Sequence, residues 1–145
     1  MKQTVFIVED ELLALNRVTK LLGSYANELT IIGKAQHGKT AIQQIEQLQP
    51  DVLFLDIQLP DMTGFKVLSQ LTYQPFVVFT TAYAEYAVQA FETYSIDYLV
   101  KPFDAERFKK AVVKLKTFTS SNVAPNYRQL TLPISKKSKN ILKAI

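Results

Sequence analysis

The sequence predicts an α/β fold in which five βα units form one parallel, doubly wound five-stranded sheet. Short apolar runs alternate along the chain with segments in which apolar residues recur at helical spacing, and this alternation is typical of βα units. The third run, Val52–Leu55, is apolar at every residue, as expected of a strand covered by helices on both faces. The last unit closes near Thr119, so we assign residues 1–119 to one domain.

The individual elements follow from hydrophobic periodicity. The predicted strands are, in chain order, Val5–Val8, Thr30–Ala35, Val52–Leu55, Phe76–Phe79 and Ile96–Val100. The clearest helical stripes are Leu12, Leu15, Val18 and Leu22, then Ala41, Ile45 and Leu48, and finally Phe108, Ala111, Val112 and Leu115. No internal repeat interrupts this order.

Composition excludes several functional classes. The chain has 145 residues and no cysteine, which excludes disulfides, thiol nucleophiles and thiolate metal sites. Hydrophobic residues make up 48% and charged residues 21%, enough apolar material for a full core. The first apolar run ends at once in carboxylates, so we expect neither a signal peptide nor a membrane span. A cytoplasmic location fits these features.

Charge is divided unevenly along the chain. Residues 1–106 contain 7 Lys/Arg and 13 Asp/Glu, whereas residues 107–145 contain 10 Lys/Arg and no acid. An acidic body with a basic C-terminal end suggests two functions, one of them contact with nucleic acid. The alternative is a solvated basic helix face followed by a lysine-rich tail. Charge alone does not separate these two interpretations.

The segment after the domain changes character. Residues 120–126 are small and polar and contain Pro125, which is typical of a linker. In residues 127–145, apolar and polar positions alternate before a lysine-rich turn and a second apolar run. This pattern indicates a short hairpin, and a lone hairpin is marginally stable. We therefore expect a basic tail that begins another domain or docks elsewhere.

Three carboxylates follow two of the predicted strands. Glu9 and Asp10 come after the first, and Asp56 after the third. Parallel strands end at one edge of the sheet, and in the doubly wound order 2-1-3-4-5 these two strands are neighbours. At ~5 Å and an effective dielectric constant of ~20, each carboxylate pair repels by roughly 3 kcal/mol. Mg²⁺ would relieve this repulsion; helix capping is the alternative for Asp10 and Glu11.

The later strands add the other groups of a phosphoryl-transfer site. Thr81 follows the fourth strand, and Lys101 follows the fifth. A single strand-end threonine is usually a helix cap, and a single lysine is usually a solvated charge. Acids, a hydroxyl and a lysine at four strand ends, in this order, are far more specific.

The motifs VEDE, FLDIQLPDMTG, FTTA and DYLVKPF together resemble the receiver domain of bacterial response regulators. The resemblance covers residues 2 to about 119 and implies the flavodoxin-like strand order 2-1-3-4-5. It implies that a sensor histidine kinase phosphorylates Asp56, with Mg²⁺ as cofactor and Lys101 paired with the phosphate. It also implies a cis bond between Lys101 and Pro102, and a switch in which Thr81 grips the phosphoryl group while Tyr98 turns inward.

The same resemblance implies the metal ligands. Asp10 and Asp56 would bind Mg²⁺ directly, Glu9 would bind through water, and Gln58 would offer its backbone carbonyl. Relatives often have Asp where this chain has Glu9, and one extra methylene leaves a water-mediated role intact. Pro60 and Gly64 are expected to shape the loop after Asp56. The single histidine, His37, is expected to be a surface residue.

A narrower resemblance comes from the aromatic-rich passage FTTAYAEYAVQAFETYSIDYLVKPF, which is similar to the LytTR family of transcription regulators. Their receivers precede a mostly β DNA-binding domain, which would begin near Tyr127. Residues 127–145 are too few to complete it, so specific DNA binding would need the full-length protein. The alternative is ordinary packing of Tyr83, Tyr86, Phe91 and Tyr94 around the fourth helix.

The expected function is regulation rather than enzymatic catalysis. Phosphorylation would drive homodimerisation and, through the DNA-binding domain, transcription. One alternative is a stand-alone receiver that acts by protein contact or phosphorelay. Another is an aspartate-nucleophile phosphatase, which is disfavoured because Gln58 stands where such enzymes need a second Asp. A flavin or dinucleotide binder is disfavoured because no glycine-rich phosphate loop follows the first strand.

Overall fold

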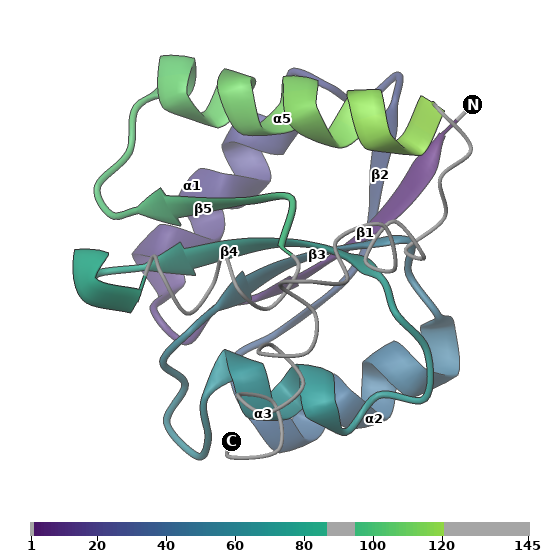
Figure 1. The fold of residues 1–145 in the computed structure, drawn as a ribbon, viewed down its shortest axis with the longest axis vertical. Helices are drawn as coiled ribbons and strands as arrows, with labels where there is room; N and C mark the ends of the chain where they lie inside the picture. Colours follow the sequence, from purple (N-terminus) through teal and green to yellow (C-terminus); the bar gives the residue numbers. More distant parts are fainter. Residues whose placement is uncertain (1, 87–94, 121–145) are drawn as a thin grey trace, which may run out of the picture.

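A computed structural model describes residues 2–86 and 95–120. It contains one sheet of five parallel strands in the order β2-β1-β3-β4-β5, with helices on both faces (Figure 1). The predicted fold class and strand order are therefore confirmed. The elements are β1 (Gln3–Val8), α1 (Leu12–Gly23), β2 (Leu29–Ala35), α2 (Gly38–Leu48), β3 (Val52–Asp56), α3 (Gly64–Ser69), β4 (Phe76–Thr81), the 3-10 turn η1 (Ala84–Tyr86), β5 (Asp97–Val100) and α5 (Ala105–Ser120).

The two faces of the sheet carry two separate core clusters. Alternate residues of a strand point to opposite faces, so Val5 and Ile7 of β1 join one cluster while Phe6 and Val8 join the other. The helices α1 and α5 cover the first face, and α2 and α3 cover the second (Figure 1). Every residue of β3 is buried, as its continuous apolar sequence predicts.

The middle of each predicted helical stripe packs as expected, but two of the stripe ends do not. Leu15, Val18 and Leu22 of α1 are buried, whereas Leu12 is 61% exposed. Leu48 at the end of α2 is 45% exposed. Periodicity alone therefore overstates the burial of these helix ends.

An ion pair between buried Asp97 and partly exposed Arg107 fixes α5 against β5. Asp97 is 5% exposed, and both of its carboxylate oxygens accept hydrogen bonds of 2.9 Å from the Arg107 guanidinium. Burial raises the pKa of Asp97, but the Arg107 hydrogen bonds, the Tyr98 N–H and the charges of Arg107 and Lys114 together outweigh burial and hold the pKa below its usual value. Arg107 also donates to the Tyr98 carbonyl at 2.9 Å. This pairing positions the strand that leads into Lys101.

Several expected features lie outside the described residues. Phe91, Tyr94 and most of the expected fourth helix lie in residues 87–94, which are not described. The predicted basic tail and linker residues 121–126 lie in the segment 121–145, which is not described either. Ser120, the first linker residue of the prediction, is the last residue of α5. In the described ranges, no helix is long and apolar enough to cross a membrane.

Candidate functional site

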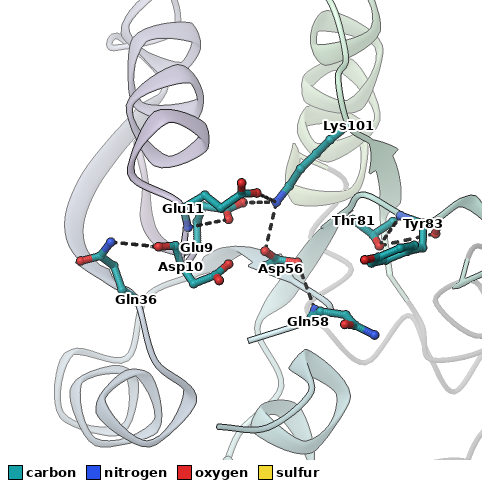
Figure 2. A network of polar contacts seen from close by, with 9 residues as sticks. All are labelled: Glu9, Asp10, Glu11, Gln36, Asp56, Gln58, Thr81, Tyr83 and Lys101. Atoms are coloured by element: carbon teal, nitrogen blue, oxygen red, sulfur yellow. Dashed lines mark hydrogen bonds and ion pairs between the residues drawn. The ribbon is translucent and has the colours of Figure 1, made fainter. Parts of the chain in front are cut away.

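The carboxylates after β1 and β3 come together at the carboxyl edge of the sheet. The two strands are hydrogen-bonded neighbours, with Val8 opposite Leu55, so the residues that follow them converge. Oxygens of Glu9, Asp10 and Asp56 all lie within 4.8 Å of one another (Figure 2). The sequence-based prediction that these acids converge is therefore confirmed. Carboxylate oxygens so arranged form a hard, anionic donor set that suits Mg²⁺.

Lys101 supplies the positive charge of this site. Its ammonium nitrogen Nζ lies 2.6 Å from Glu9 Oε1, 3.0 Å from Asp56 Oδ2 and 3.7 Å from Glu11 Oε1. Figure 2 shows the side chain extending from the end of β5 to the acids of β1 and β3. The backbone N–H of Lys101 donates to the Thr81 carbonyl at 2.7 Å, and the bond to Pro102 is cis. Glu11 in this contact was not predicted.

Burial and mutual repulsion perturb the acids of the site. Glu9 is 1% exposed and Asp56 is 3% exposed. Burial is the main cause that raises the pKa of Glu9 to about 7, against the lowering effect of Lys101. Burial also raises the pKa of Asp56, although Glu9, Lys101 and the Gln58 N–H favour its charged form. Burial lowers the pKa of Lys101, but its two carboxylate partners together raise the pKa by more than burial lowers it. Lys101 therefore stays protonated. One lysine does not neutralise the cluster.

The loop after β3 is held close to Asp56. The Gln58 backbone N–H donates to Asp56 Oδ1 at 3.0 Å, and the Gly64 N–H donates to the Ile57 carbonyl at 2.7 Å. A Cβ atom at Gly64 would collide with the Asp56 carbonyl oxygen. The prediction that Gly64 shapes this loop is therefore confirmed, for the physical reason that only glycine allows this close approach.

The same loop is anchored to α2. Both carboxylate oxygens of Asp61 accept backbone N–H bonds, one from Gly38 at 2.8 Å and one from Lys39 at 3.0 Å. These bonds cap the helix from a distant part of the chain and, as the largest causes, lower the pKa of Asp61. The Met62 side chain packs where a Cβ of Gly38 would lie. Sequence patterns do not reveal this cap, because the carboxylate is more than twenty residues away.

Thr81 ends β4 and is fully buried at the same edge. Its hydroxyl accepts the Tyr83 N–H at 3.0 Å and donates to the Tyr83 carbonyl at 3.4 Å. The structure thus places Thr81 beside the site, as predicted from its strand-end position, but with its hydroxyl engaged by its own loop. Tyr98 is half-buried on β5 and packs against the core cluster that α2 and α3 cover.

Comparison with known proteins agrees with this geometry. Residues 5–113 match the family described as the response regulator receiver domain. The chain belongs to this family. The receiver is 46% identical to an uncharacterized response regulatory protein of Vibrio cholerae, over 85% of this chain and 48% of that protein. It is 41% identical to the sensory transduction protein LytT of Bacillus cereus, over 82% of this chain and 49% of that protein.

Solved structures show the same fold. The response regulatory domain of mrkE from Klebsiella pneumoniae is 33% identical, with a TM-score of 0.74 and coverage of 82% of this chain and 99% of that chain.

The receiver also matches the transcriptional regulatory protein BtsR of Salmonella typhi, at 40% identity over 77% of this chain and 47% of that protein. The chain spans about half the length of the curated relatives that it matches.

Three other candidate residues are exposed at the surface of the receiver. His37 is exposed and precedes the first turn of α2, so its placement as a surface residue is confirmed. Pro60 is exposed in the loop after β3. Tyr83 is 48% exposed, and its ring meets Tyr86 edge-on, with ring centroids 6.1 Å apart.

Proposed function

We propose that this receiver accepts a phosphoryl group on Asp56 from the phosphohistidine of a sensor kinase. The observation that carries the proposal is the convergence of Glu9, Asp10, Asp56 and Lys101 at one sheet edge. An Asp56 oxygen would attack phosphorus in line as the phosphorus–nitrogen bond breaks and its electron pair returns to the histidine. Because such a transfer has a loose transition state, the protein contributes mainly position and electrostatics.

The donor set fits Mg²⁺, whose ligands are hard oxygens. Asp10 and Asp56 would bind it directly, with Glu9 acting through water and Gln58 through its carbonyl. The ion would supply positive charge beside the transferring phosphoryl group. Lys101, already 3.0 Å from Asp56, would pair with a phosphoryl oxygen and leave the carboxylate free to react. In this proposal the chain is a phosphoacceptor and not an enzyme in its own right.

The regulatory output would follow from Thr81 and Tyr98. Once Asp56 is phosphorylated, the Thr81 hydroxyl would leave Tyr83 and bind a phosphoryl oxygen, which vacates space for Tyr98 to turn inward. The changed surface would favour a homodimer. Phosphorylation would thus be a local change of charge that shifts the receiver between two surface conformations. The likeness to LytT and BtsR supports transcription control through a LytTR-type DNA-binding domain of the full-length protein.

Phosphorylation from a small-molecule donor tests the proposal. We expect acetyl phosphate to modify the chain once in the presence of Mg²⁺ and not in the presence of EDTA, since the uncompensated carboxylates repel the donor. Intact-protein mass spectrometry measures the product. Equal modification with and without a divalent cation would contradict the proposed site.

Mg²⁺ should also stabilise the fold. With a dissociation constant near ~1 mM, ~10 mM Mg²⁺ adds about 1.4 kcal/mol to the free energy of unfolding, visible as a higher melting temperature. Asp10→Ala should abolish this increase, because it removes a direct ligand. Glu85→Ala, which removes an exposed carboxylate outside the cluster, should retain it. A melting temperature that is the same in EDTA and in Mg²⁺ would argue against a metal site.

A further inference from the structure

A hydrogen bond joins the loop after β3 to the turn after β4. The Gln58 side-chain amide donates to the Tyr86 hydroxyl, while the Gln58 backbone N–H donates to Asp56 Oδ1 at 3.0 Å. One residue therefore contacts both the proposed phosphoacceptor and Tyr86. In Figure 2 the Gln58 side chain leads away from Asp56.

Tyr86 is well placed to hold that amide. Its ring is half-buried, packs against the core cluster beneath α2 and α3, and meets the Tyr83 ring at 82°. These two contacts restrain the Tyr86 ring, whereas Gln58 is exposed and has three rotatable side-chain bonds. The hydrogen bond thus restrains a side chain that would otherwise be free to turn over Asp56.

The position of this amide matters for hydrolysis of a phosphorylated aspartate. In that reaction a water oxygen bonds to phosphorus as the bond from phosphorus to the Asp56 oxygen breaks, and its electron pair stays on the carboxylate. One water proton remains on the inorganic phosphate and the other passes to solvent. A glutamine carboxamide can accept a hydrogen bond from such a water and orient it for attack.

We infer that Tyr86 is a positioning residue that holds the Gln58 amide away from the phosphorylated Asp56 and so lengthens the lifetime of the signal. This inference rests on the proposed function. The turn that carries Tyr86 is also the turn that engages Thr81: the Tyr86 N–H donates to the Tyr83 carbonyl at 3.2 Å, and this carbonyl also accepts from the Thr81 hydroxyl. Movement of Thr81 toward the phosphoryl group would therefore break its hydrogen bond to the Tyr83 carbonyl, which Tyr86 also contacts.

The test compares dephosphorylation rates after acetyl phosphate is removed, with Mg²⁺ present. Tyr86→Phe retains the ring and removes the hydrogen bond that restrains the Gln58 amide. We expect this loss to speed hydrolysis about fivefold. Tyr83→Phe is the matched control, because its hydroxyl makes no hydrogen bond to a described residue, and it should keep the wild-type rate. In a Gln58→Met background, which lacks the amide but keeps the backbone carbonyl, Tyr86→Phe should have no effect.

These outcomes separate a positioning role from a structural one. A loss of packing would speed hydrolysis in both backgrounds, whereas positioning requires the Gln58 amide. An unchanged or slower rate in Tyr86→Phe, or an equal acceleration in the Gln58→Met background, would overturn the inference and leave the proposed function standing. Wild-type protein that takes up no phosphoryl group would overturn the proposed function, and this inference with it.

Discussion

Asp56→Asn should abolish phosphorylation, lowering modification by acetyl phosphate or a histidine kinase at least about 100-fold. The amide keeps the shape of the side chain but is not a nucleophile. No described carboxylate replaces it, because only Asp56 ends a central buried strand with Lys101 at 3.0 Å. Modification is measured by phosphate-affinity electrophoresis and by mass spectrometry of the intact chain.

Two controls make this result specific. Asp51→Asn changes an exposed aspartate just before the same strand, at the opposite edge of the sheet, and should be modified at the wild-type rate. Without metal, Asp56→Asn should be at least as stable as wild type. The substitution removes one buried negative charge, and Glu9 retains its 2.6 Å contact with Lys101. Modification that persists in Asp56→Asn would refute the assignment of Asp56.

Lys101→Met should destabilise the metal-free receiver by about 3 kcal/mol near neutral pH. The substitution keeps an aliphatic chain of similar length but leaves Glu9 and Asp56 buried, at 1% and 3% exposure, without their cation. Burial already raises the pKa of Glu9 to about 7 and raises the pKa of Asp56, with Lys101 opposing both effects. Removing the lysine should raise both pKa values further.

This prediction carries a definite pH dependence. A carboxyl group with a raised pKa in the folded state binds more protons there than in the unfolded chain, so stability falls as pH rises through that pKa. For each unit by which folding raises the pKa of a carboxyl group, the free energy of unfolding is lower by about 1.4 kcal/mol once the pH exceeds the raised pKa. The defect of Lys101→Met should therefore be small at about pH 5.5 and large at about pH 8.

Urea unfolding in EDTA measures the effect at both pH values. Lys109→Met, which removes an exposed lysine of α5, should change stability little at either pH. A defect of Lys101→Met that is equal at both pH values would mean that packing, and not the two carboxylates, accounts for the loss.

The fold class and most of the site could be predicted from the order of residues along the chain. Each candidate residue lies within two positions of the end of a short predicted apolar strand, and parallel strands bring their carboxyl ends to one edge whatever the details of packing. That rule, together with the order of the motifs, predicted that Glu9, Asp10, Asp56, Thr81 and Lys101 lie at this edge, where the structure has them. The three carboxylates predicted at these strand ends likewise indicated a cation that would relieve their repulsion.

The pairing of these groups depends on tertiary packing and could not be predicted in the same way. The contact of Lys101 with Glu9, the Asp61 cap on α2 and the Asp97–Arg107 pair join elements that periodicity treats separately. The link from Gln58 to Tyr86 joins two loops in the same way. Periodicity reports which side of an element is buried, but a hydrogen bond between two loops depends on distances that only packing sets. For the same reason the sequence placed Leu12 on the buried stripe of its helix, while the structure leaves it exposed at the start of α1.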